Sequence, residues 1–249
     1  MDARWLFRSS HRGFTLVEML AVIVIIAILA SLITAAAIAA RRKAVIAVIN
    51  AEINQLDLAC KAYKAKFGDY PPDFTNANDL ARHVRRAFPR YTGGPPAALS
   101  GSEALHYWLA GPDGKGWSAN PRDPFNTTTT SRIPPFFEFD AGRLRGHEYY
   151  PPRIPVPRSR PYVYFKAVNG GYDTNVQNCG GAVPVEDTRV GTAMLTGWSN
   201  TNSFQIQSAG LDGKYGVGQK FPDGSDYNDD RFDDQGNFCK QGTLGDEMP

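Results

Sequence analysis

The sequence predicts an α+β protein in which a long N-terminal α-helix packs on a small antiparallel β-sheet. The helix is indicated by residues 14–67, which contain neither glycine nor proline although the chain of 249 residues has 24 Gly and 18 Pro. Apolar residues also recur at helical spacing in the second half of this stretch. The sheet is indicated by short runs of aromatic and β-branched residues later in the chain, bounded by proline and glycine.

The first half of the expected helix is apolar on all sides. Residues 19–40 form a run of 22 without a charged side chain. At about 1.5 Å per residue such a run is roughly 33 Å long, enough to cross a hydrocarbon core of about 30 Å. We therefore expect a transmembrane segment over residues 14–40. A buried helix of a soluble protein and a cleaved secretory signal are the alternatives, and the run is long for both.

Beyond the basic residues 41–43 the pattern becomes amphipathic. Apolar side chains follow the i, i+3/i+4 spacing as far as Phe67, and Gly68 then supplies a helix stop. We expect residues 41–67 to continue the helix and to turn one apolar stripe toward a globular domain of residues 68–249.

Regular structure after the long helix is expected in short pieces, because residues 71–161 hold 15 of the 18 prolines. The spacing of Ser100 and Glu103 is that of a capping box and predicts a helix that ends before Gly111. Three runs are predicted to be strands: residues 136–139, 162–166 and 204–207.

The overall charge is nearly balanced, with 27 Lys+Arg against 25 Asp+Glu. This balance argues against a general nucleic-acid binder, and no nucleic-acid partner is expected. The two signs of charge are unevenly distributed along the chain: residues 14–209 carry a net charge of +5 and residues 210–249 carry −5. The sequence thus joins a basic part to an acidic C-terminal part.

Two basic stretches have more than one interpretation. Arg82, Arg85, Arg86 and Arg90 are either a phosphate-binding patch or a solvated helix face, and the arginines of residues 143–160 either grip an acidic polymer or form a charged loop. The sequence shows no nucleophile–base pair, phosphate loop or metal-ligand spacing of a known motif, so the protein is not expected to be an enzyme.

The segment Arg12-Gly13-Phe14-Thr15-Leu16-Val17-Glu18-Met19-Leu20 resembles the leader and cleavage segment of type IV prepilins and type II secretion pseudopilins. The resemblance implies that residues 1–13 are a leader, and that prepilin peptidase cleaves between Gly13 and Phe14 and methylates the new amine of Phe14. It also implies that Glu18 offsets the positive amino terminus of a neighbouring subunit during filament assembly.

Further resemblance is to the major pseudopilin, through Gly68-Asp69-Tyr70-Pro71 and residues 120–125. It implies a structural subunit of a type II secretion pseudopilus: single-pass in the inner membrane, with a cytoplasmic N-terminus and a periplasmic globular domain. Its partners would be other pseudopilins in a homo-oligomeric filament, prepilin peptidase and the inner-membrane assembly platform. The chain is long for this family, so we expect an insertion within residues 126–203. The alternatives are a type IV pilin for adhesion, motility or DNA uptake, and a membrane-anchored polymer-binding module.

The acidic C-terminal stretch is, by composition, either a Ca²⁺ site or a solvated loop, since Ca²⁺ takes about 6–8 oxygen ligands from such segments. Gly210-Leu211-Asp212-Gly213 and residues 233–238 resemble the calcium-binding loop of major pseudopilins. The resemblance implies Ca²⁺ ligands at Asp212, Asp233 and Asp234 within an acidic loop of residues 210–238.

Three cysteines are too few for a disulfide scaffold. Cys60 lies on the apolar stripe of the helix and is expected to be buried. The periplasmic location that the resemblance implies is oxidising, and it makes Cys179 and Cys239 a candidate disulfide.

Overall fold

The computed structural model describes residues 13–96, 99–174, 179–192, 195–240 and 242–249. The chain divides into two units, Met1–Lys43 and Ala44–Pro249. Except for Gly13, the predicted leader lies outside the described residues.

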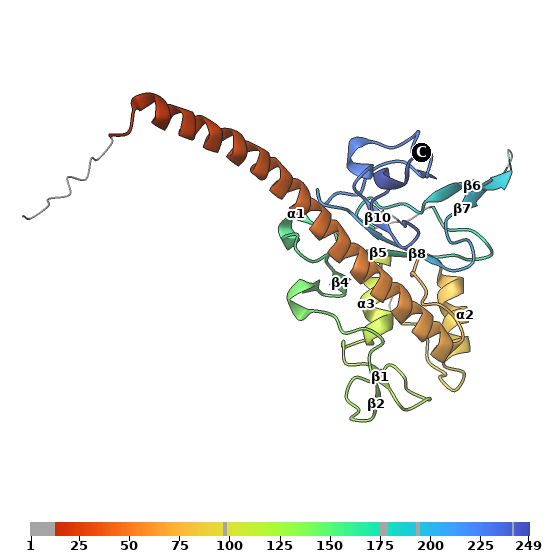
Figure 1. Ribbon diagram of the computed structural model, residues 1–249. Helices are drawn as coiled ribbons and strands as arrows, with labels where there is room; N and C mark the ends of the chain where they lie inside the picture. Colours follow the sequence, from red (N-terminus) through yellow and green to blue (C-terminus); the bar gives the residue numbers. More distant parts are fainter. Residues whose placement is uncertain (1–12, 97–98, 175–178, 193–194, 241) are drawn as a thin grey trace, which may run out of the picture. The chain divides into compact units, whose positions relative to one another are not determined.

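The long N-terminal helix α1 spans Leu16–Phe67 and is drawn in red to orange in Figure 1. It begins two residues after the predicted start and ends at the predicted residue. Its described residues as far as Lys43, in the first unit, are all exposed. An 18-residue window of α1 has a mean hydropathy of 3.0 and no buried residue. By length and composition, α1 is the one described helix that could cross a membrane.

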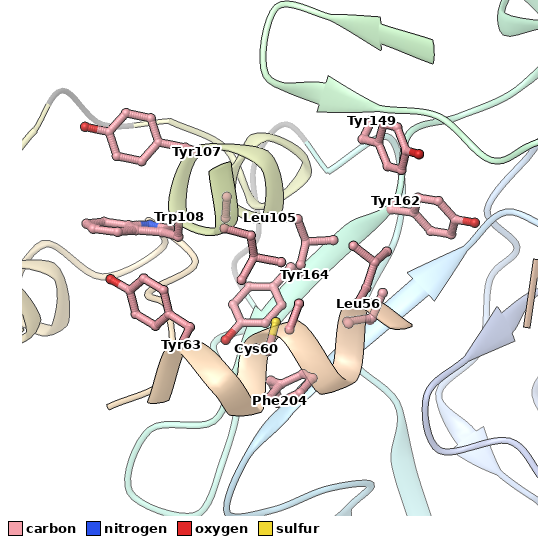
Figure 2. Close-up of a cluster of buried hydrophobic side chains, with 14 of the residues drawn as sticks. Leu56, Cys60, Tyr63, Leu105, Tyr107, Trp108, Tyr149, Tyr162, Tyr164 and Phe204 are labelled. Atoms are coloured by element: carbon pink, nitrogen blue, oxygen red, sulfur yellow. The ribbon is translucent and has the colours of Figure 1, made fainter. Parts of the chain in front are cut away.

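The second half of α1 supplies the predicted apolar stripe to the core of the second unit. Five stripe residues are at most 1% exposed: Ile49, Ile53, Leu56, Cys60 and Tyr63. Burying an aliphatic or aromatic side chain of this size contributes about 1.5–3 kcal/mol, so this face is a major source of stability. Figure 2 shows three of them together with Leu105, Trp108, Tyr162 and Tyr164 from other parts of the fold.

Two shorter helices flank this core, α2 (Ala77–Ala87) and α3 (Gly101–Ala110). The side chain of Asn76 caps α2 by accepting the backbone N–H groups of Asn78 and Asp79. The predicted capping box opens α3: the carboxylate of Glu103 accepts both the backbone N–H and the hydroxyl of Ser100, each at 2.9 Å.

The central sheet is antiparallel, with the strand order β10–β8–β5. Its strands are β5 (Val163–Lys166), β8 (Phe204–Ser208) and β10 (Gln235–Gly236). They confirm the predicted strands 162–166 and 204–207. Because β5 lies within residues 126–203 and pairs with β8, this stretch contributes a strand to the central sheet.

The other strands are short and form three-stranded or two-stranded arrangements. β6 (Glu186–Thr192) pairs antiparallel with β7 (Leu195–Trp198) and parallel with β9 (Lys220–Phe221). Two hairpin-like pairs are antiparallel: β1 (Trp117–Ser118) with β2 (Arg132–Ile133), and β3 (Leu144–Arg145) with β4 (Glu148–Tyr149). The small antiparallel sheets and the long helix confirm the α+β fold class.

The predicted strand at residues 136–139 was wrong. This stretch has no ladder partner, and it follows two prolines, which remove backbone donors. Its phenylalanines instead make edge contacts: Phe136 lies 5.4 Å from Tyr63 and Phe139 lies 4.8 Å from Tyr149, between ring centroids. The apolar run reflects aromatic packing rather than strand pairing.

A buried acid fastens α1 to the globular part. Glu52 forms an ion pair with Arg143, and the hydroxyls of Tyr149 and Tyr162 donate to its carboxylate at 2.9 and 2.8 Å. All four polar groups meet on one face of α1. Although Glu52 is a charged residue, the structure buries it to 9% exposure.

A second buried network joins the end of α1 to α2 and β5. The Lys166 ammonium contacts Asp69 at 2.8 Å and Asp79 at 3.1 Å, and it is only 4% exposed. On α1, the Tyr63 hydroxyl is 2.9 Å from Nε2 of His83, which is part of α2. Paired and hydrogen-bonded in this way, the buried charges fix the relative placement of these elements.

Candidate functional site

The predicted processing site lies in an open stretch of backbone just before α1. A Cβ built on Gly13 would meet nothing within 4 Å, and the side chain of Phe14 is 71% exposed. The described residues therefore leave the Gly13–Phe14 bond accessible, as a bond cleaved by a peptidase must be.

Glu18 closes a capping box at the start of α1. The backbone N–H and the hydroxyl of Thr15 both donate to Oε2 of Glu18 at 2.8 Å, and the Glu18 N–H donates back to the Thr15 hydroxyl at 3.2 Å. These bonds satisfy donors that the first turn of a helix leaves without an intrahelical partner. The role of Thr15 was missed, although its spacing to Glu18 is the capping-box signature.

Around this start the helix exposes an apolar surface. The side chains of Leu16, Leu29 and Ile33 are 82, 53 and 67% exposed, and the large apolar residues between them are similarly uncovered. A surface of this size is covered in a working protein by lipid or by another protein. The first unit thus combines an open cleavage bond, a placed carboxylate and a helix with an uncovered apolar surface.

The acidic loop, residues 210–238, brings three carboxylates near one another. Burial and the neighbouring Asp233 and Asp230 raise the pKa of Asp212 to about 6. Oδ2 of Asp233 accepts the backbone N–H groups of Leu211 and Asp212 at 2.6 and 2.9 Å. The mutual repulsion shows that these acids lie close together without enough opposing charge.

Asp234 lies apart from that group and is paired with Arg231. Both side chains are fully buried, and Nη1 of Arg231 donates to Oδ2 of Asp234 at 2.8 Å. The same oxygen accepts the Gly216 N–H at 3.1 Å. Burial still raises the pKa of Asp234 to about 7, in spite of the guanidinium.

The structure does not group the predicted calcium ligands, and calcium binding at Asp212, Asp233 and Asp234 stays a prediction. No three His, Cys, Asp or Glu side chains among the described residues are grouped so that they could hold a metal ion. Asp234 is directed at Arg231, and the buried atoms without a partner include donors of Arg231 as well as Oδ1 of Asp233 and Asp234. The charge placed beside Asp234 is a guanidinium, which sequence reasoning missed.

The predicted disulfide between Cys179 and Cys239 is not formed. Cys179 packs with Val163, Phe165 and Tyr215, whereas Cys239 packs against a separate cluster around Phe221. Cys60 is fully buried, as predicted. That prediction rested only on the oxidising periplasm, which does not indicate which cysteines are close in space.

A histidine pair lies beside α3 and predicts a pH dependence. The Nδ1 atoms of His106 and His147 are 2.8 Å apart, so one ring must donate and the other accept, which requires an unprotonated acceptor. Burial lowers the pKa of both, that of His106 to about 4.

We expect a fragment of residues 44–249 to lose about 1–2 kcal/mol of this pair's stabilisation as the pH falls from about 6.5 to 4.5, allowing for partial exposure. The unfolded histidines take up protons there and the folded pair resists them. Urea unfolding at both pH values, with His147→Phe as comparison, measures it. Carboxylates with a raised pKa increase the stability of both proteins as the pH falls, so they cannot produce the loss. If His147→Phe lost as much stability as the wild-type fragment, the histidine pair would not be its cause.

Comparison with known families identifies the N-terminal segment. A model of the prokaryotic N-terminal methylation motif matches residues 8–34, which include Gly13, Phe14, Glu18 and the first part of α1. No curated protein and no solved structure matches the chain. The N-terminal segment thus carries the methylation motif and continues into a transmembrane-like helix, which supports a type IV prepilin-like protein.

Proposed function

We propose that the protein is a structural subunit of a type II secretion pseudopilus. Prepilin peptidase removes residues 1–13, and the first half of α1 then joins those of other pseudopilins in a filament that drives protein export. The observation that carries this proposal is the methylation motif at residues 8–34, continuous with an exposed apolar helix. The Gly68–Pro71 segment favours the pseudopilin branch of these proteins.

In this proposal Glu18 receives the new amino terminus of a neighbouring subunit. Opposite charges at about 4 Å attract by about 4 kcal/mol at an effective dielectric of 20. The carboxylate is already fixed in the first turn by Thr15, so little freedom is lost when a partner docks.

The proposed location follows from the same role. The chain crosses the inner membrane once, with the N-terminus in the cytoplasm before processing and the second unit in the periplasm. Its partners are prepilin peptidase, the assembly platform and further pseudopilins. The role in this proposal is mechanical rather than catalytic.

The proposal is tested by the intact mass of the full chain made in cells with and without prepilin peptidase. We expect the protein to lack residues 1–13 and to carry a methyl group only where the peptidase is present. Gly13→Val should retain the leader because the glycine is at the cleavage point. Gly94→Val is the matched control, since a Cβ there also meets nothing within 4 Å, and it should be processed normally.

Two outcomes separate the rivals. An unprocessed chain in the presence of the peptidase would refute the filament role and favour a membrane-anchored binding module. Processing together with loss of motility or DNA uptake on gene deletion, and with intact protein export, would assign the subunit to a type IV pilus instead.

A further inference from the structure

Part of the positive charge of the second unit lies where the end of α1 meets α2. Five exposed cations lie there, which we call the basic face: Lys64, Lys66, Arg85, Arg86 and Arg90. The two helices are joined by a contact between the rings of Phe67 and Phe88, with centroids 5.1 Å apart.

The basic face is not neutralised by its own chain. Nearby Lys61 and Arg82 form ion pairs with Asp57 and Asp79. In the part of the chain that the structure describes, no carboxylate lies within ion-pair distance of the five cations of the basic face. Lys64 instead lies over the ring of Tyr70, 4.1 Å from its centroid. Positive charge therefore remains available to another molecule.

The acidic loop presents the opposite charge. Four of its carboxylates are exposed: Asp212, Asp223, Asp226 and Asp229. Two apolar side chains of the same loop are also exposed, Val217 at 69% and Phe232 at 38%. The loop also exposes Lys214 and Lys220, so acids outnumber bases among its exposed charges but do not stand alone. A mainly acidic surface with exposed apolar groups is typical of a surface that meets a protein partner.

The two surfaces lie at different levels of α1 within the second unit. The acidic loop is attached to α1 near Ile46, whose carbonyl accepts Nε2 of Gln235 at 3.3 Å, and its last residues reach Asp57, whose carboxylate accepts Nδ2 of Asn237 at 3.1 Å. The basic face begins further along, at Lys64. Figure 1 shows the blue C-terminal segment along α1 and α2 beside its C-terminal end. At about 1.5 Å per residue, Lys64 lies about 27 Å beyond Ile46 along α1 and about 10 Å beyond Asp57.

We propose that the acidic loop of one copy of this chain docks on the basic face of a second copy. This inference rests on the proposed function, since filament assembly through α1 sets the helices of neighbouring copies parallel. A shift along parallel helices brings the acidic loop of one copy level with the basic face of the other. The two surfaces are unlike, so the contact is heterologous and repeats head to tail, which generates an open filament rather than a closed dimer.

Charge exchange tests the contact in the full chain, assembled in cells that carry the secretion system. The variant Arg85→Glu/Arg86→Glu should reduce the yield of sheared filaments at least tenfold. Asp223→Lys/Asp229→Lys should do the same, and the combination of all four should restore at least half of the wild-type yield. The matched control is Lys115→Glu/Arg122→Glu, two exposed cations outside both surfaces, which should assemble normally.

A carbodiimide, which couples an amine to a carboxylate in direct contact, gives a second readout. Cross-linked filaments should contain an amide between Lys64 or Lys66 and a carboxylate of the acidic loop. The same amide should be absent from the dispersed, unassembled chain, which assigns it to a contact between copies. Filament yield should also fall as salt is raised, because the contact is between exposed charges.

The outcomes distinguish this inference from the proposed function. Wild-type filaments without the cross-link, or a four-residue exchange that fails to restore assembly of folded and processed chains, would overturn the contact and leave the filament role intact. Loss of binding to vesicles of anionic phospholipid in the Arg85→Glu/Arg86→Glu variant, without rescue by the exchange, would assign the basic face to lipid. A wild-type chain that forms no filament would instead refute the proposed function.

Discussion

Replacing Glu52 by alanine is expected to lower the free energy of unfolding of a fragment of residues 44–249 by about 3–5 kcal/mol. The change removes the carboxylate that pairs with Arg143 and accepts the hydroxyls of Tyr149 and Tyr162. It leaves a partly buried guanidinium without its charge partner. Chemical denaturation followed by circular dichroism measures the loss.

The matched control is Glu138→Ala, because Glu138 is exposed and substitutions at such positions usually change stability by less than about 0.5 kcal/mol. The double variant Glu52→Leu/Arg143→Leu should be less destabilised than Glu52→Ala, since it leaves no charge unpaired. If Glu52→Ala lowered the free energy of unfolding by less than about 1 kcal/mol, the network would orient α1 without adding much to stability.

Replacing Arg231 by methionine is expected to cost a similar amount, about 3–5 kcal/mol at pH 8. The guanidinium and Asp234 are both fully buried, so the variant leaves an ionised carboxylate inside the acidic loop. The loss should shrink as the pH falls below about 7, because Asp234 has a raised pKa, to about 7, and becomes neutral. Denaturation of the 44–249 fragment at pH 8 and pH 5 measures both effects.

Arg158→Met is the control, since Arg158 is exposed. Adding Asp234→Asn to Arg231→Met should restore part of the stability at pH 8, because the buried charge is then gone. If the loss in Arg231→Met is the same at pH 5 as at pH 8, an ionised Asp234 is not its cause.

The long helix was predictable because its signals are local. The absence of glycine and proline and the change from uniform to amphipathic apolarity fixed its limits to within two residues at the start. The capping box at Ser100 and the alternation at residues 204–207 are equally local. The strand expected at residues 136–139 failed because its residues find aromatic neighbours distant in sequence rather than a ladder partner.

The candidate site divides in the same way. Gly13, Phe14 and Glu18 belong to one short motif, which the family model also matches. Whether Asp212, Asp233 and Asp234 lie close together depends on how the acidic loop folds, which no short motif determines. In the structure Asp234 is paired with Arg231. Glu52 could have been found, because it lies three residues after Ile49 and four before Leu56, on the apolar stripe itself. Its partner Arg143 is 91 residues away in sequence, and no local pattern indicates it.

The continuity of α1 has a mechanical consequence. No glycine or proline interrupts the helix from Leu16 to Phe67, and its last third is the stripe on which the aromatic core is built. A tensile load applied to the first turns is therefore carried by helical backbone directly into the core, without a slack linker to extend. Glu52 and its three partners form a buried charged anchor on α1 that shares such a load with the globular part.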